Sequence, residues 1–170
     1  MTRLVLDTGV IVSALLFRSE ASALFEAWRD GRFLLAVTDA ILDEYARALR
    51  YPLFRLTEDE AVGIMEQLVL PYCQRFDAVV GPRYCPDPDD DKFVNCALVA
   101  QAGALVSADR ELLRLAASVA RVPIIPVADA VARFGRRPRH PRAVKSSSPR
   151  GGGRRRGGLR PSRGREGPSG

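Results

Sequence analysis

Short apolar runs alternate along the chain with longer segments in which apolar residues recur every three or four positions. The short runs predict strands at residues 3–6, 33–37, 104–107 and 123–127, with a weaker candidate at 72–76. Pro123 and Pro126 cannot donate to a strand ladder, so the strand that contains them is expected at a sheet edge.

The longer segments predict helices over roughly residues 9–16, 21–29, 39–49, 57–70, 91–103, 112–115 and 128–134. Thr57 with Glu60 three residues later is typical of a capping box at a helix start. The alternation of strands and helices is typical of βα units. We therefore predict an α/β fold around a mostly parallel sheet of four or five strands.

The composition changes at residue 135. Residues 1–134 contain the whole alternating pattern, whereas residues 135–170 consist largely of Arg, Gly, Pro and Ser. Such a segment cannot bury enough apolar area to offset the entropy of ordering. We predict one globular domain followed by a disordered basic tail.

Charge divides the chain in the same way. Residues 136–170 hold twelve basic side chains and one acidic one, whereas residues 1–135 hold fourteen basic and nineteen acidic side chains. A basic tail on an acidic domain indicates contact with nucleic acid or another polyanion. Within the tail, Arg154, Arg155 and Arg156 lie between glycines, as in flexible segments that bind RNA loosely. A tail without selected function fits this composition equally well.

The residue content argues against several function classes. The N-terminus lacks a signal-peptide pattern and no apolar run is long enough to span a membrane, so we expect a cytoplasmic protein with no membrane partner. The three cysteines fit neither a disulfide framework nor a zinc site. The only histidine, His140, lies in the tail, which disfavours His-based catalysis in the domain. Glycine motifs for dinucleotides and phosphate loops are absent.

Two acids follow predicted strands. Asp7 ends the first strand, and Asp109 follows the strand at 104–107. Ligands of an open α/β sheet bind at the carboxyl ends of its strands, so both side chains enter one crevice if these strands are neighbours. The alternative for each acid is a helix cap, because Asp is a preferred N-cap and a helix follows in both cases.

A third candidate, Glu44, lies in the middle of a predicted helix among small and apolar neighbours. Asp43 is more easily explained, because Arg47 stands at the spacing of a solvated ion pair. A simple surface role for Glu44 is equally consistent with the sequence, since most Glu side chains are exposed.

The acid run 89–91 supplies a fourth candidate. Asp90 continues the apolar face of the following helix and is preferred, with Asp91 as the alternative ligand. All three acids can also be explained by the positive end of that helix.

Several carboxylates crowded together resist ionisation unless a cation neutralises them. Oxygen ligands without His or Cys select hard ions, so Mg²⁺ or Mn²⁺ is expected. Such ions activate water and orient a phosphodiester, which is the chemistry of a nuclease.

The acids lie in motifs that resemble a known family. The segments 7–14 (DTGVIVSA), 87–93 (DPDDDKF) and 107–113 (SADRELL), together with Glu44, resemble the PIN-domain ribonucleases and are closest to the branch of the VapC toxins. The resemblance extends from about residue 2 to residue 134. It implies a three-layer α/β/α sandwich whose acidic pocket binds Mg²⁺ or Mn²⁺ and cleaves single-stranded or structured RNA.

The resemblance also assigns residues. The acidic positions fall on Asp7, Glu44, Asp90 and Asp109, with Asp91 not separated from Asp90 as a metal ligand, and with Thr8 and Ser107 beside the pocket. The family often has Asn where this chain has Gly9, so one polar group is missing. A small cognate antitoxin and a homodimer are expected partners.

The leading hypothesis is a metal-dependent endoribonuclease, the toxin of a toxin-antitoxin pair. The main alternative is a nuclease-derived protein without turnover that binds RNA through its tail. A nuclease acting on DNA is a third reading, because the phosphate chemistry is shared and no reader of the 2′-hydroxyl is recognisable.

Overall fold

The computed structural model describes residues 1–78, 81–117, 119 and 121–135. Arg154, Arg155, Arg156 and the predicted tail beyond Gly135 lie outside these residues. The strands are β1 (Arg3–Leu6), β2 (Leu34–Val37), β3 (Cys73–Arg75), β4 (Ala104–Ser107) and β5 (Ile124–Pro126). The α-helices are α1 (Thr8–Leu16), α2 (Ser22–Arg29), α3 (Asp39–Leu49), α4 (Glu58–Ile64), α5 (Asp91–Val99), α6 (Arg110–Arg114) and α7 (Val127–Ala130).

The five strands form one sheet in the order β3-β2-β1-β4-β5, and every neighbouring pair is parallel. The predicted α/β fold is confirmed. β1 and β4 are central and almost completely buried, in keeping with their continuous apolar runs. The weak candidate at 72–76 is a real edge strand, β3, and the proline-flanked β5 forms the other edge, as predicted.

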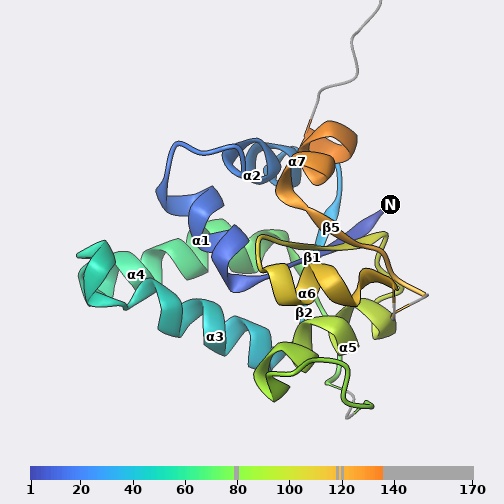
Figure 1. Ribbon diagram of the computed structural model, residues 1–170. Coiled ribbons are helices and arrows are strands. Elements are labelled where there is room, and N and C mark those ends of the chain that lie inside the picture. Colours follow the sequence, from blue (N-terminus) through green and yellow to red (C-terminus); the bar gives the residue numbers. More distant parts are fainter. Residues whose placement is uncertain (79–80, 118, 120, 136–170) are drawn as a thin grey trace, which may run out of the picture. The chain divides into compact units, whose positions relative to one another are not determined.

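Helices cover both faces of the sheet. Figure 1 shows α2 and α7 on one side of the strands and α5 on the other. α5 packs across β1, β2 and β4, while α7 packs against β4 and β5. None of the helices in the described ranges is long and apolar enough to cross a membrane.

Two predicted helices end earlier than the pattern indicated. α4 ends at Ile64 and continues as a π-turn (Met65–Val69) and a 3-10 turn (Leu70–Tyr72). Pro71 lies in the 3-10 turn, where an α-helix could not accommodate it. α5 ends at Val99 rather than near residue 103, and Gln101 takes the left-handed conformation with φ 48°. Both departures lie at helix ends, where local packing decides the boundary.

The last helical turn (Val131–Gly135) extends one residue beyond the predicted end of the domain. The carbonyl oxygen of Gly135 accepts a hydrogen bond from Arg32 Nη1 at 2.8 Å. Gly135, predicted as the first residue of the tail, is therefore held against the folded part of the chain.

Candidate active site

The strand order places a crevice between β1 and β4. From β1 the chain adds β2 and β3 on one side, then crosses over and adds β4 and β5 on the other. The point where the order reverses is where open α/β sheets bind ligands, at the carboxyl ends of the strands. Asp7 follows β1 directly and Asp109 lies two residues beyond β4, so the neighbouring strands bring these two acids to one crevice.

Asp7 is 6% exposed and is held at both carboxylate oxygens. Its Oδ1 accepts a hydrogen bond from the Val10 N–H at 2.7 Å, which confirms the predicted cap of α1. Its Oδ2 accepts hydrogen bonds from the Ser107 hydroxyl and from the Ala108 N–H at 3.2 Å. Burial raises the pKa of Asp7, and the charge of Asp109 adds to this effect, although the hydrogen bonds oppose it. Asp7 can therefore cap α1 and also belong to the crevice.

Ser107 links the two central strands. Its completely buried hydroxyl donates to Asp7 and accepts a hydrogen bond from the Asp109 N–H at 2.9 Å. The exposed Asp109 side chain in turn caps α6, with Oδ1 accepting from the Glu111 N–H at 2.6 Å. Ser107 therefore fixes the carboxylate of Asp7 relative to the backbone that carries Asp109.

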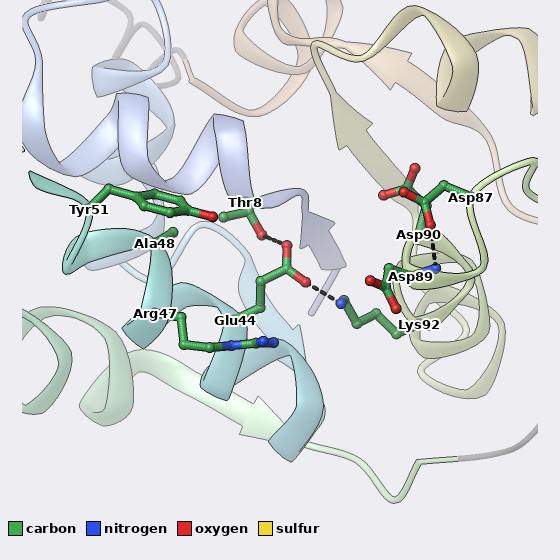
Figure 2. A pocket seen from close by; sticks show the side chains of 9 residues that line it. All are labelled: Thr8, Glu44, Arg47, Ala48, Tyr51, Asp87, Asp89, Asp90 and Lys92. Carbon is green, nitrogen blue, oxygen red and sulfur yellow. Dashed lines mark hydrogen bonds and ion pairs between the residues drawn. The ribbon is translucent and has the colours of Figure 1, made fainter. Parts of the chain in front are cut away.

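Glu44 reaches the same region from α3. Its side chain is 26% exposed, and neither oxygen is free: Oε1 accepts a hydrogen bond from the Thr8 hydroxyl, while Oε2 pairs with the ammonium group of Lys92 (Figure 2). Thr8 begins α1 and Lys92 lies in the first turn of α5. Glu44 thus joins three helices at one point, which a simple surface role does not explain.

Tyr45, the neighbour of Glu44, holds α3 against the end of β1. The ring is 1% exposed, and the hydroxyl donates to the carbonyl oxygen of Leu6, the last residue of β1. Burial raises the pKa of Tyr45 far above its usual value, and the charges of Asp7 and Glu44 contribute to this rise. The sequence pattern places Tyr45 only in an apolar stripe, but a buried tyrosine hydroxyl needs a partner. A sequence reading could have used this requirement to predict that Tyr45 anchors α3 to another element.

The periodicity predicts Asp90 on the buried face of α5, but the structure buries Asp91 and leaves Asp90 partly exposed. Asp91 is the buried one, and its Oδ1 accepts hydrogen bonds from the N–H groups of Tyr84 and Cys85, both at 2.8 Å. Burial raises the pKa of Asp91, but these two hydrogen bonds, the Cys85 thiol and the charge of Arg83 together lower it below its usual value. The prediction of Asp90 as the buried residue is wrong, because residues 84–85 fold over the start of α5. Asp91 therefore fixes this loop, and it does not line the hollow described below.

Asp90 remains beside the other predicted site residues. Its carboxylate accepts no hydrogen bond from any residue in the described ranges. Burial raises its pKa to about 6, with further contributions from the negative charges of Asp87, Asp109 and Glu44, and with Lys92 opposing the rise. Asp90 is therefore within electrostatic reach of Glu44 and of Asp109, which itself acts on Asp7.

A hollow of about 370 Å³ separates Glu44 from Asp90. Figure 2 shows the two acids on opposite walls, one formed by α1 and α3 and the other by the start of α5. We call this hollow the acidic pocket. Its lining consists of Thr8, Glu44, Arg47, Ala48, Tyr51, Asp87, Asp89, Asp90 and Lys92. Asp7 and Asp109 lie at the crevice and do not line it.

The predicted metal site is assembled only in part. In the described part of the chain, no group of three or more His, Cys, Asp or Glu side chains lies close enough together to hold a metal ion. The donor chemistry nevertheless fits a hard cation. The carboxylate of Asp90 lacks a hydrogen-bond donor and is repelled by its neighbours, while Glu44 already pairs with the cationic Lys92. Both observations indicate a pocket whose negative charge favours a cation.

Six lining residues were not among the predicted site residues: Arg47, Ala48, Tyr51, Asp87, Asp89 and Lys92. Lys92 follows the acid run directly, whereas Arg47 and Tyr51 lie three and seven residues after Glu44, on the same side of α3 and its continuation. The expected ion pair between Asp43 and Arg47 is wrong. Arg47 instead donates from Nε to the Asp43 carbonyl oxygen at 3.4 Å and turns toward the pocket. Their helical spacing from Glu44 could have predicted Arg47 and Tyr51 as lining residues.

Comparison with known families identifies the family to which the chain belongs. Residues 3–111, which include Asp7, Glu44, Asp90 and Asp109, match the family model of the PIN domain. The chain belongs to the PIN-domain family. PIN domains are generally nucleases, and they generally use divalent metal ions. No match to an individual curated protein was found.

Gly9 departs from the pattern often found in PIN domains. A Cβ atom at this position would meet only Asp7 Oδ1, at an ordinary contact distance of 3.5 Å. The residue is exposed in the first turn of α1 and does not have a positive φ. Neither the backbone conformation nor the available space requires glycine here. The only consequence of Gly9 is that a polar side chain is missing at this position.

Proposed function

We propose that this PIN domain is a metal-dependent endoribonuclease that hydrolyses RNA phosphodiester bonds. The observation that carries the proposal is the match of residues 3–111 to the PIN domain. The structure supports it in that Asp7 and Asp109 follow neighbouring strands at the switch point of the sheet, while Glu44 and Asp90 line the acidic pocket. Burial is the largest cause of the raised pKa of Asp90, and the charges of Asp87, Asp109 and Glu44 add to it, so a bound cation would favour the ionised form.

The residues have distinct roles in this proposal. Asp7, Glu44, Asp90 and Asp109 would hold Mg²⁺ or Mn²⁺, which neutralises the phosphate and activates the attacking water when bound. Ser107 and the N–H groups around Asp7 keep its carboxylate in one orientation. Thr8, on the same wall as Glu44, orients the Glu44 carboxylate through its hydroxyl.

The test is an RNA cleavage assay with the purified full chain. We expect internal cuts in a labelled single-stranded RNA with Mn²⁺ or Mg²⁺, and loss of cleavage when EDTA removes the ion. A DNA of the same sequence in parallel establishes whether the sugar matters. Cleavage that persists in EDTA, or none with any divalent ion, would contradict the proposal.

The biological role that we propose is that of a toxin held inactive by a small cognate antitoxin in the cytoplasm. The support is the resemblance of the segments 7–14, 87–93 and 107–113 to the VapC branch. A homodimer belongs to the same proposal. Growth arrest on expression of the chain, relieved by co-expression of the product of an adjacent small reading frame, tests this role. Growth unaffected by an active nuclease would contradict it.

The alternative function is RNA binding without turnover, and the charge of residues 136–170 favours it. Deletion of these residues distinguishes the two. If the chain is an enzyme, the shortened protein retains metal-dependent cleavage, while its RNA affinity at moderate salt falls about tenfold or more and depends less steeply on salt. Titration of labelled RNA at several salt concentrations measures both quantities. Loss of binding, with no cleavage by either protein, would favour the alternative.

A further inference from the structure

A second hollow, of about 340 Å³, adjoins the acidic pocket and has a different character. Its lining is mostly apolar and aromatic: Thr8, Gly9, Val12, Ser13, Phe17, Ala48, Tyr51 and Phe54. Thr8, Ala48 and Tyr51 line both hollows, so the two share a wall. The crevice therefore continues from a charged compartment into an apolar one.

Aromatic side chains dominate the second hollow, and we call Phe17, Tyr51 and Phe54 the aromatic shelf. Tyr51 is 63% exposed and Phe17 is 52% exposed. The rings of Phe17 and Phe54 meet edge to face, with centroids 6.0 Å apart. Large exposed aromatic side chains gathered beside a cleft are typical of a binding surface rather than of ordinary protein surface.

The shelf is built on a fixed turn. After α3, the Tyr51 N–H donates to the Ala48 carbonyl oxygen at 3.1 Å, and the Tyr51 carbonyl oxygen accepts from the Phe54 N–H at 3.0 Å. Pro52 follows and starts a 3-10 turn (Pro52–Phe54). Figure 2 shows the Tyr51 ring beside Ala48, with its hydroxyl directed toward Thr8. The backbone that carries Tyr51 therefore does not have to be ordered when a flat ligand packs against the ring.

A cationic group completes the arrangement. Arg47 lines the acidic pocket close to Tyr51, and in the described ranges its only hydrogen bond is the one from Nε to the Asp43 carbonyl oxygen. It forms no ion pair there with Glu44, whose carboxylate is occupied by Thr8 and Lys92. The terminal guanidinium nitrogens of Arg47 therefore remain available to a phosphate group.

We propose that Arg47 and the aromatic shelf form a nucleotide subsite, in which Arg47 binds a phosphate and Tyr51 stacks on the adjoining base. The proposal rests on the proposed nuclease function and adds where a base next to the cleaved bond binds. A nucleotide combines a charged and a flat apolar part, as the two joined hollows do. A base within a duplex stacks on its neighbours and is not free to lie on Tyr51, so the subsite selects unpaired substrate.

Binding of short oligonucleotides tests the subsite independently of cleavage. The full chain is titrated in EDTA with a fluorescent pentauridylate and with its fully abasic sugar-phosphate analogue. Tyr51→Ala is expected to weaken binding of the pentauridylate about 5- to 150-fold, the range measured for loss of one stacked base. It leaves binding of the analogue unchanged. Tyr51→Phe keeps the ring and is expected to bind as the wild type does.

Leu53→Ala is the matched control, because Leu53 is 83% exposed on the same turn and lines neither hollow. It is expected to leave both affinities unchanged. If Tyr51→Ala weakens binding of both ligands equally, or of neither, the subsite is overturned. Thermal unfolding of each variant shows whether a loss of binding reflects a loss of fold.

Cleavage kinetics and the oligomeric state distinguish a failure of the subsite from a failure of the nuclease function. In a cleaving enzyme, Tyr51→Ala is expected to raise KM more than it lowers kcat. If the wild type binds the pentauridylate through Tyr51 but cuts no RNA, the subsite stands and the nuclease function fails. If the wild type cuts RNA and Tyr51→Ala changes neither KM nor binding, the nuclease function stands and the subsite fails. Conversion of a dimer to a monomer by Tyr51→Ala in sedimentation would assign the shelf to a second copy of the chain and overturn the subsite.

Discussion

Replacement of Asp7 by Asn is expected to reduce Mn²⁺-dependent RNA cleavage on the order of 10²–10³-fold, the usual effect of removing one preorganised electrostatic group from an active site. The amide carries no negative charge for a cation, and its nitrogen cannot accept the hydrogen bonds that Ser107 and Ala108 donate. Initial rates measured with saturating RNA over a range of Mn²⁺ concentrations check this expectation.

The fold of the Asp7→Asn variant is expected to survive. Asn is as good an N-cap as Asp, so its oxygen can still accept the hydrogen bond from the Val10 N–H that caps α1. The Ala108 N–H loses its acceptor, which costs about 1 kcal/mol. Relief from burying the charge of Asp7, whose pKa is raised, partly offsets this cost. Circular dichroism and thermal unfolding measure the balance.

Asp43→Asn is the matched control for Asp7→Asn. The Asp43 side chain is exposed on α3, next in sequence to Glu44, and does not line the acidic pocket. The same change from acid to amide is therefore expected to leave cleavage within about twofold, as for most surface substitutions. Equal cleavage by wild type and Asp7→Asn would remove Asp7 from the proposed mechanism.

Replacement of Asp90 by Asn is expected to make the protein more stable and less active at once. The pKa of Asp90 is about 6 in the folded chain, above the ordinary value of 3.8. The folded state therefore binds this proton more tightly than the unfolded state does. As the pH rises from about 4 to about 6 the wild type loses stability, and above pH 6 the whole loss is present.

Asn at position 90 has no charge to lose and avoids that penalty. Above pH 7 we expect the melting temperature of Asp90→Asn to exceed that of wild type by about 2–4 °C, which corresponds to about 1 kcal/mol after allowance for solvent screening of this partly exposed group. Near pH 4 the difference is expected to vanish. RNA cleavage falls in the same variant, because the removed charge belongs to the proposed metal site.

A second readout concerns the ion itself. Mn²⁺ is expected to raise the melting temperature of the wild type, since a ligand that binds only the folded state stabilises it, and to raise that of Asp90→Asn much less. Asp77→Asn makes the same change on an exposed side chain outside the pocket, and is expected to show neither effect. A lower melting temperature for Asp90→Asn at neutral pH would show that the charge of Asp90 stabilises the fold instead.

Much of the fold was predictable because it depends on local pattern. The apolar runs at 3–6 and 104–107 are too short for helices and too apolar for surface strands, and they form the two central strands. The capping box of Thr57 and Glu60 forms as predicted, with both reciprocal hydrogen bonds. The family was likewise recognisable from the order of its acids.

The site was less predictable where tertiary contacts decide. Helical periodicity cannot show that residues 84–85 fold over Asp91 and offer it two N–H groups, so the burial of Asp90 and Asp91 was reversed. The partner of Lys92 is Glu44, which lies 48 positions earlier, and no local pattern connects them. Tyr51 lies just past the end of α3, where its side chain direction depends on a turn rather than on helix geometry.

The hydrogen bond between Ser107 and Asp7 joins residues 100 positions apart. During translation, a nascent chain exposes Asp7 and Glu44 long before β4 and Asp109 have been synthesised. Pairing of parallel strands over such a separation is also slow, because the intervening chain must be ordered first. Any nuclease activity that needs Asp7 and Asp109 together is therefore absent from a chain that ends before β4 has paired with β1.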